Sequence, residues 1–285
     1  MMLKLGLIQF SASDQPTENL KTVLQMIRDA HAQGAEFILT PEVTNCISVD
    51  QEHQRSVFYH QKDDPSLKAY QNIAVELGIH LLIGSLAVLS NDPDGRFANR
   101  CFMIGPKGQI IKQYDKIHMF DVALSKSETY RESKGYRPGD KAMTVDCGFG
   151  TVGLAICYDL RFAQLFRALA QAGAKIITVP AAFSPVSGKA HWHVLLRARA
   201  IETGCYILAP AQTGTHKASV GKERQTYGHS LVVSPWGEVI ADALTDVGIT
   251  IVEIDLEQVE SARRRIPSLQ HDRKYQPPEC QPKTL

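Results

Sequence analysis

Two segments with the same pattern limit most strongly what this chain can fold into. Phe102–Ile111 and Leu231–Ile240 each consist of apolar residues, a turn containing Pro-x-Gly, a polar residue and further apolar residues. Proline fits the second position of a β-turn because its φ is already near −65°, and glycine tolerates the positive φ that many turns need. Each segment is therefore predicted to be a β-hairpin, and the two hairpins lie in different halves of the chain.

Segments typical of strands and of helices alternate before each hairpin. Short apolar runs predict strands, whereas apolar residues spaced three or four apart predict amphipathic helices. This alternation, with no stretch typical of a linker, predicts a single α/β domain in which two sheets stack face to face and helices cover both outer faces, a four-layer αββα sandwich. The predicted strands include Leu3–Gln9, Phe37–Thr40, Ile79–Ile83, Met143–Val145 and Thr151–Ile156, and the predicted helices include Leu20–His31, Leu67–Leu77 and Phe162–Ala172.

We expect this domain to span residues 1–265. Residues 266–285 are polar and rich in proline. This composition predicts an extended C-terminal tail, either disordered or laid across a partner subunit.

Composition excludes several classes of function. The 285 residues include 31 basic and 30 acidic side chains, so the formal net charge is +1, and no surface for nucleic acid or for an anionic membrane is expected. No apolar stretch reaches the roughly 18 residues that a membrane-spanning helix needs. Met1–Phe10 lacks a basic beginning and continues into polar residues, so we interpret it as the first strand rather than as a secretion signal.

The six cysteines favour a cytoplasmic protein with reduced thiols. The chain is long and contains no closely spaced cysteine pairs, whereas disulfide frameworks are typical of short secreted domains. No Cys-x-x-Cys unit supports a structural zinc ion, and neither a metal nor another cofactor is expected.

One of these cysteines, Cys157, occupies a position that suits a nucleophile. It follows the predicted strand Thr151–Ile156 and precedes the predicted helix that begins near Phe162. A strand-to-helix turn can expose a side chain and direct backbone N–H groups at an oxyanion. Considered alone, a single cysteine is more often a small buried packing residue, and the rest of the sequence has to decide the role of Cys157.

Two further polar residues stand just beyond predicted strands. Glu42 follows the strand Phe37–Thr40, and Lys116 follows the second strand of the first hairpin. Layered α/β folds place their chemistry at strand ends. Either residue alone would be a solvated surface group, but a carboxylate, an ammonium and a thiol in matching local contexts indicate a shared site.

The chain resembles the nitrilase superfamily of carbon–nitrogen hydrolases. The matching segments around the three residues are Leu39–Glu42, Tyr114–Asp121 and Ala155–Phe162. The resemblance covers nearly the whole chain and is strongest to the Nit branch, which includes deaminated glutathione amidase and ω-amidase. Further matching segments are Glu132–Lys134, Ala190–Trp192, Leu195–Glu202, Pro210–Gly214 and Tyr227–Gly237.

The resemblance implies a Glu–Lys–Cys site that works without a metal. Glu42 would be the general base, and Cys157 the nucleophile that forms a thioester. Lys116 and the backbone N–H of Tyr158 would stabilise the oxyanion. Glu132, a second glutamate of the family, would keep Lys116 charged and help to orient the substrate. The resemblance also implies a homodimer or a larger homo-oligomer.

Four residues are predicted to bind substrate: Arg161, Phe183, His193 and Tyr227. Arg161 either holds a substrate carboxylate or forms an ion pair with Asp159. The position of His193 is usually glutamate in the resembled branch, a departure that bears on recognition of the substrate's tail. His191 and His193 point about 200° apart on a helix, so they are not expected to share a metal.

The expected activity is hydrolysis of a small amide that also carries a carboxylate, giving acid and ammonia. In the resembled superfamily, nitrilases follow the cysteine with Trp-Glu and carbamoyl-amino-acid hydrolases carry two adjacent arginines nearby. Here Tyr158-Asp159 follows the cysteine, which favours an amide over a nitrile as the substrate. Leu160-Arg161 stands in place of the two adjacent arginines, which weakens the hypothesis of a carbamoyl-amino-acid hydrolase. Deaminated glutathione amidase is the first expectation and ω-amidase on 2-oxoglutaramate-like acids the second. A catalytically silent interaction protein is the alternative from another class.

Overall fold

Two six-stranded sheets form the centre of the protein, and the computed structural model describes residues 1–124, 128–276 and 278. The first sheet has the order β16-β1-β2-β3-β4-β5, and the second has the order β15-β14-β11-β10-β9-β8. The first sheet contains β1 (Met2–Gln9), β2 (Phe37–Leu39), β3 (His80–Val88), β4 (Ala98–Ile104), β5 (Ile110–Asp115) and β16 (Gly248–Asp255). The second contains β8 (Met143–Asp146), β9 (Thr151–Leu154), β10 (Ile176–Thr178), β11 (Tyr206–Ala209), β14 (Leu231–Val233) and β15 (Val239–Asp242).

The two sheets repeat one topology. In the first, β1, β2 and β3 are parallel, and the hairpin β4–β5 continues the sheet in antiparallel fashion. In the second, β9, β10 and β11 are parallel, and the hairpin β14–β15 follows in the same way. Both predicted hairpins are therefore confirmed, and the two halves of the chain correspond strand by strand.

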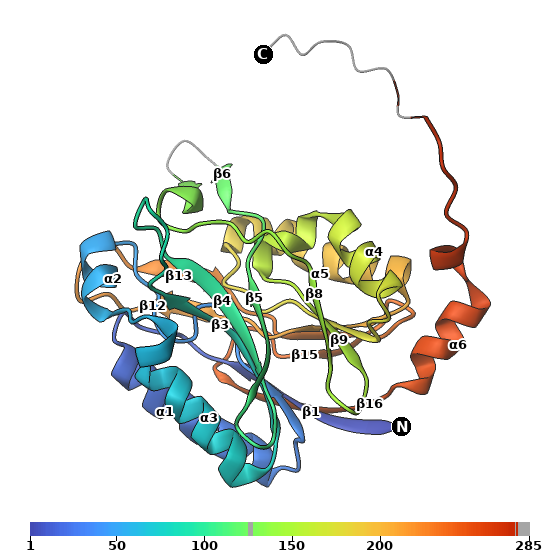
Figure 1. Ribbon diagram of the computed structural model, residues 1–285, viewed down its shortest axis with the longest axis horizontal. Coiled ribbons are helices and arrows are strands. Elements are labelled where there is room, and N and C mark those ends of the chain that lie inside the picture. The colour runs from blue at the N-terminus through green and yellow to red at the C-terminus, as the bar shows by residue number, and fades with distance from the viewer. Residues whose placement is uncertain (125–127, 277, 279–285) are drawn as a thin grey trace.

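Helices cover the outer face of each sheet, which completes the four-layer αββα arrangement (Figure 1). Helices α1 and α3 lie on one side of the molecule, and α4 and α5 on the other. The helices are α1 (Pro16–Ala32), α2 (Gln51–Val57), α3 (Pro65–Leu77), α4 (Ala163–Gln171), α5 (Pro185–Thr203) and α6 (Glu257–Arg265). Short 3-10 turns are η1 (Gln61–Asp63), η2 (Glu132–Lys134), η3 (Cys157–Arg161) and η4 (Ser268–Gln270), and two small ribbons pair β6 (Asp121–Ala123) with β7 (Thr129–Arg131) and β12 (Thr213–His216) with β13 (Arg224–Tyr227).

Alternation along β1 shows how the sequence separates the layers. Leu5 and Leu7 belong to the core that the two sheets share, whereas Ile8 packs in the cluster beneath α1 and α3. Successive side chains of a strand point to opposite faces, so an uninterrupted apolar strand is buried on both sides. This explains why the central strands contain almost no polar residues.

The ends of α3 follow local chemistry that the sequence displays. The Asp64 carboxylate caps the helix by accepting the Leu67 N–H at 2.8 Å, and Pro65 occupies the first turn. Gly78 ends the helix with φ 64°, a left-handed conformation that favours glycine. The predicted helix over Leu67–Leu77 is confirmed, and it begins two residues earlier.

The C-terminal tail begins with a contact to its own chain. After α6, the turn η4 lies against α4, where Arg167 Nη2 donates to the Ser268 carbonyl at 2.9 Å and the Arg167 guanidinium pairs with Asp272. Residues 277 and 279–285 of the predicted tail lie outside the described residues. None of the helices within the described ranges is long and apolar enough to cross a lipid bilayer.

Candidate active site

Three loops that leave the carboxyl ends of strands bring Glu42, Lys116 and Cys157 together. Glu42 follows β2, Lys116 follows β5 directly, and Cys157 follows β9 and begins η3. All three side chains are buried and line one cavity. The structure therefore brings these residues together as the sequence analysis expects.

The turn that carries Glu42 is strained and tightly held. Val43 has φ 47°, which is unfavourable for a β-branched residue, and its N–H donates to Ser85 Oγ at 2.7 Å. Gly84 allows this turn to sit close to β3, because a Cβ at that position would lie 2.1 Å from the Thr40 carbonyl oxygen and 2.4 Å from Pro180 Cβ. Glu42 therefore has little freedom to move away from the site.

Cys157 also sits in a strained conformation, with φ 48°. Its own N–H donates to the Pro180 carbonyl at 2.9 Å, and the Asp159 N–H donates to the Ile156 carbonyl at 3.0 Å. The Tyr158 N–H has no hydrogen-bond acceptor among the described residues. This N–H is therefore available to an oxyanion that forms beside the thiol.

Asp159 couples the cysteine loop to the lysine loop. Its fully buried carboxylate accepts hydrogen bonds from the Ile156 N–H at 2.9 Å and from the Tyr114 hydroxyl at 2.7 Å. The same carboxylate contacts His118 Nδ1 at 2.7 Å. Asp159 thus binds Tyr114 and His118, the residues two before and two after Lys116 in the chain. Asp159 forms no ion pair with Arg161, which was one of the two predicted roles of Arg161.

Lys116 lies between the two glutamates. Its Nζ is 2.9 Å from Glu42 Oε1 and 2.9 Å from both carboxylate oxygens of Glu132. The Ala182 N–H donates to Glu42 Oε2 at 2.8 Å, and the Phe120 N–H donates to Glu132 Oε2 at 2.6 Å. Each carboxylate is therefore fixed by a backbone donor as well as by the ammonium.

These contacts set the charge of each group. Burial alone would raise the pKa of Glu42, but the charge and hydrogen bond of Lys116, together with Cys157 and Arg224, outweigh burial and lower that pKa. Burial alone would lower the pKa of Lys116, but the Glu132 and Glu42 carboxylates hold that pKa well above its ordinary value. Burial and the Glu42 carboxylate raise the pKa of Cys157 well above its ordinary value. The resting site therefore holds a carboxylate base, an ammonium and a neutral thiol.

The lowered pKa of Glu42 gives an expected pH profile. The ordinary pKa of a glutamate is 4.5, and the pKa of Glu42 is lower, so Glu42 is still ionised at pH 5. We therefore expect kcat/KM for an uncharged amide to stay nearly constant between about pH 5 and 8. Ionised Glu42 also stabilises the folded protein. This contribution is fully present above the pKa that Glu42 has in the unfolded chain, and it is lost as the pH falls through the lower pKa of Glu42 in the folded protein. Rates measured across this range test the assignment, and an acidic limb centred near pH 6 to 7 would contradict it.

A cavity of about 330 Å³ opens over these residues. Such a volume suits a small-molecule substrate. Glu132 and Phe183 line it, as the sequence analysis expects. The remaining walls include Phe120, Tyr130, Arg131, Tyr136, Ser184 and Arg224.

Three of the predicted substrate-binding residues lie away from the cavity lining. Arg161 places its guanidinium over the Tyr158 and Phe183 rings, and His191 Nδ1 lies 3.3 Å from it. The His193 ring contacts Asp242, and the Tyr227 ring stacks on the His229 ring. Of the four residues that are predicted to bind substrate, Phe183 alone lines the cavity.

Two residues of the site escape sequence reasoning. Asn99, on β4, donates from Nδ2 to Glu42 Oε1 at 2.9 Å, and its buried Oδ1 has no partner. Arg224, at the start of β13, reaches the cavity from the opposite half of the chain. A lone arginine in a polar segment carries no local signal of such a role, whereas Asn99 could have been suspected as a polar residue within an apolar strand.

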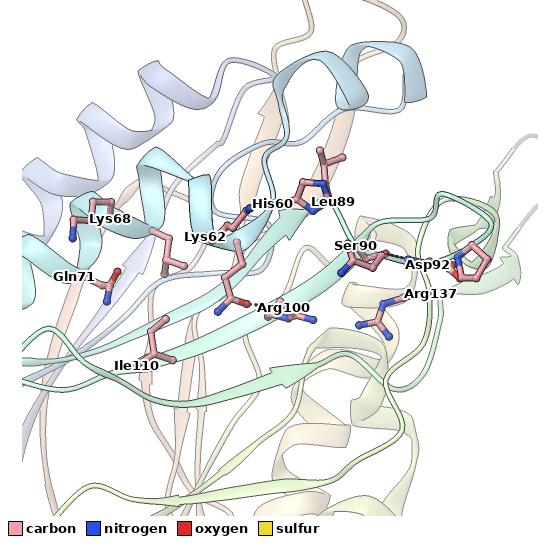
Figure 2. A pocket seen from close by; sticks show the side chains of 14 residues that line it. His60, Lys62, Lys68, Gln71, Leu89, Ser90, Asp92, Arg100, Ile110 and Arg137 are labelled. Carbon is pink, nitrogen blue, oxygen red and sulfur yellow. Dashed lines mark hydrogen bonds between the residues drawn. The ribbon is translucent and has the colours of Figure 1, made fainter.

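A larger groove of about 990 Å³ lies elsewhere on the surface (Figure 2). It shares no lining residue with the catalytic cavity. Two of its cations, Arg100 and Arg137, are already paired with Asp115 at 2.5 and 2.7 Å. The groove is basic but shows no group that acts on the catalytic residues.

The fold and the site together define the class of protein. A family model described as carbon-nitrogen hydrolase matches residues 4–264. The chain belongs to the carbon–nitrogen hydrolase family, and the resemblance to the nitrilase superfamily is confirmed. It is a hydrolase that acts on carbon–nitrogen bonds other than peptide bonds.

Individual relatives lie within the Nit branch. A Synechocystis protein named deaminated glutathione amidase is 38% identical over 93% of this chain and 96% of its own length. Human omega-amidase NIT2 is 35% identical over 95% of each chain. The solved structure of the C. elegans NitFhit protein superposes with a TM-score of 0.87 at 32% identity, covering 95% of this chain, and this chain spans only 65% of NitFhit.

Proposed function

We propose that this protein is an amidase that hydrolyses a small amide bearing a carboxylate, with deaminated glutathione as the first candidate substrate. The observation that carries the proposal is the buried Glu42–Lys116–Cys157 cluster at the base of a cavity that also contains an arginine. Relatives named deaminated glutathione amidase support the choice of substrate. An ω-amidase activity is the second candidate, since human omega-amidase NIT2 is nearly as similar.

The geometry supports a thioester mechanism. Glu42 takes the proton of the Cys157 thiol as Sγ bonds to the carbonyl carbon, and the carbonyl oxygen becomes an oxyanion beside Lys116 Nζ and the Tyr158 N–H. Glu42 then gives its proton to the departing nitrogen as the carbon–nitrogen bond breaks. In the resting site the three N–H donors of Lys116 face Glu42 Oε1 and both Glu132 oxygens at 2.9 Å. Glu42 becomes a weaker acceptor once it takes the thiol proton, so the donor that faced it can turn to the oxyanion.

The second half of the reaction uses the same base. A water molecule loses a proton to Glu42 and attacks the thioester carbon, and the carbon–sulfur bond breaks to release the acid and restore the thiol. Glu132 keeps Lys116 protonated throughout, since both of its oxygens lie 2.9 Å from Nζ. An unsubstituted amide yields ammonia, whereas a substituted amide such as deaminated glutathione yields an amine.

Arg224 is the group that we assign to the substrate carboxylate. Its Nη2 donates to the Ala182 carbonyl at 2.8 Å, and its guanidinium lies over the Tyr130 ring. Its buried Nε has no hydrogen-bond partner. Arginine binds carboxylates through two parallel N–H donors, so a guanidinium with an unused donor in the cavity wall suits an anionic substrate.

A panel of amides tests the substrate class. It should contain deaminated glutathione, a 2-oxoglutaramate-like amide and neutral amides of matched length, with release of acid and of ammonia or amine followed by mass spectrometry. We expect the carboxylate-bearing amides to be hydrolysed at least about tenfold more efficiently, the typical value of one charged hydrogen bond. Turnover of none of them would favour the alternative of a catalytically silent interaction protein.

Replacing Arg224 with glutamine should separate binding from chemistry. We expect KM for a carboxylate-bearing amide to rise about 10- to 100-fold with a smaller change in kcat, because a charge-assisted contact is lost. Steady-state kinetics with a neutral amide provide the control, which should change little. Equal losses for charged and neutral amides would remove Arg224 from carboxylate recognition.

We further propose a cytoplasmic homodimer. The five described cysteines are all buried and unpaired, which suits a reducing compartment. Apolar side chains are exposed on α5 and on the β14–β15 hairpin, which meet where Arg197 Nε donates to the Gly237 carbonyl at 2.7 Å. Such a patch is typical of an interface between subunits, and sedimentation equilibrium tests it. Its exposed residues are Val186, Val194, Ile201, Trp236, Val239, Ile240 and Leu244.

A further inference from the structure

Three side chains with metal-binding atoms meet outside the catalytic cavity. His193 on α5, His229 between β13 and β14, and Asp242 at the end of β15 are the one such group within the described ranges. His193 Nε2 lies 3.1 Å from Asp242 Oδ2, and His229 Nδ1 lies 3.1 Å from the same oxygen. All three ligand atoms lie within 4.8 Å of one another. None of the three residues lines the catalytic cavity.

The carboxylate is oriented by the backbone. Asp242 Oδ1 accepts the Leu244 N–H at 2.8 Å, and Leu244 adopts φ 53°. The carboxylate is thereby held with Oδ2 3.1 Å from a nitrogen of each imidazole, and His229 Nδ1 also lies 3.0 Å from Oδ1. Backbone donors of this kind orient carboxylate ligands in known metal sites.

The two histidines are also fixed in position. His229 adopts φ 57°, and its N–H donates to the Leu244 carbonyl at 2.6 Å. Its carbonyl accepts the indole N–H of Trp192 at 2.8 Å. Since Trp192 is fully buried and directly precedes His193, this bond holds the helix and the turn together and sets the separation of the two imidazoles.

We propose that His193, His229 and Asp242 bind a divalent transition-metal ion of the zinc class. Zinc takes histidine nitrogen and carboxylate oxygen at about 2.0 to 2.2 Å in a tetrahedron, which places its ligands about 3.3 Å apart. Two of the separations here are 3.1 Å, so an ion between the three atoms requires only small movements. The side chains are 34%, 17% and 23% exposed, which leaves room for water as the fourth ligand.

The donor set also suits the charge of such an ion. Two neutral imidazoles and one carboxylate contribute a single negative charge, and imidazole nitrogen is a preferred ligand of zinc. His191 takes no part in the cluster: its Nδ1 lies 3.3 Å from the Arg161 guanidinium, whereas the partners of His193 lie far along the chain. The competing arrangement is a hydrogen-bonded His–Asp–His cluster that binds no metal.

Metal binding by the full-length protein tests the proposal. After treatment with a chelator and its removal, zinc should bind at about one ion per chain in competition with a colorimetric chelator, and Co²⁺ should give the visible absorption of a tetrahedral site. His193→Gln and Asp242→Asn should each weaken zinc binding at least about tenfold. His191→Gln, on the same helix but outside the cluster, should bind zinc as the wild type does.

Thermal unfolding supplies a second measurement. An ion that binds only the folded chain raises the melting temperature by mass action. Zinc should therefore raise Tm of the wild type and of His191→Gln, and it should raise Tm of His193→Gln clearly less. Failure of the wild type to bind zinc, or equal binding by His193→Gln and the wild type, would overturn the site and leave the hydrogen-bonded cluster.

Discussion

Serine in place of Cys157 is expected to reduce kcat at least about 10⁴-fold while the protein stays folded, in line with removal of a nucleophile in other hydrolases. The two side chains are nearly the same size, but a hydroxyl is far harder to ionise than a thiol. The Cys157 thiol hydrogen-bonds to the Glu42 carboxylate, which is the base that takes its proton. Rates of amide hydrolysis and a thermal melt check both parts of the prediction.

Cys147 offers a matched control for this substitution. It is buried to nearly the same extent, at 6% exposed against 7% for Cys157, but it lies outside the cavity lining. Cys147→Ser should keep its activity, with at most a modest loss of stability. If Cys157→Ser retains more than about one per cent of the parent's kcat, Cys157 is not the nucleophile.

Arginine in place of Lys116 should be almost as damaging as alanine. The Lys116 ammonium is 2% exposed and lies 2.9 Å from carboxylate oxygens of both glutamates, so the site is built around a compact point charge. A planar guanidinium does not occupy this space, and the oxyanion loses its main donor. Lost oxyanion donors typically reduce kcat about 10²- to 10³-fold.

Comparing two substitutions separates chemistry from stability at this position. Lys116→Ala leaves the buried Glu42 and the partly buried Glu132 without a counter-charge, and breaking a buried pair in this way typically costs about 3 to 5 kcal/mol of unfolding free energy, whereas Lys116→Arg keeps the charge. Melting curves should therefore show Lys116→Ala to be less stable than Lys116→Arg, whereas steady-state kinetics should give both variants a similarly low kcat. Lys134→Arg, on the exposed turn beyond Glu132, is the control and should be unaffected. An arginine variant that keeps most of its kcat would mean that Lys116 supplies only distant charge.

The meeting of Glu42, Lys116 and Cys157 was predictable from sequence because each residue has a local signal. Glu42 and Cys157 follow apolar strands and Lys116 follows the second strand of the first hairpin, so each stands at the carboxyl end of a strand, where layered α/β folds place their chemistry. The repeated topology of the two sheets follows from the two Pro-x-Gly hairpins. These features rest on periodicity and turn chemistry, which act over a few residues.

The walls of the cavity were not predictable in this way. Arg224 reaches the site only because the two sheets, which come from opposite halves of the chain, stack on each other. The residues next to Arg224 in the sequence give no sign of this position. The reverse holds for Arg161, whose place four residues after Cys157 suggested a contact that the cavity lining does not include. A residue four positions from Cys157 need not point its side chain into the same cavity, because the strained backbone at Cys157 and the 3-10 turn η3 change the direction of the chain between them.

The central claim is that one carboxylate, Glu42, handles the proton in both halves of the reaction. Glu42→Gln nearly preserves the size of the side chain that accepts the Ala182 N–H and contacts Lys116, but it removes the base. The direct test is intact-mass spectrometry after mixing with an activated ester, which can acylate Cys157 without help from a base. We expect the wild type to show a covalent adduct that decays on the timescale of turnover, and Glu42→Gln to form the same adduct and retain it. Deacylation of Glu42→Gln at the wild-type rate would contradict the claim and make Glu132 the first candidate for the residue that activates water.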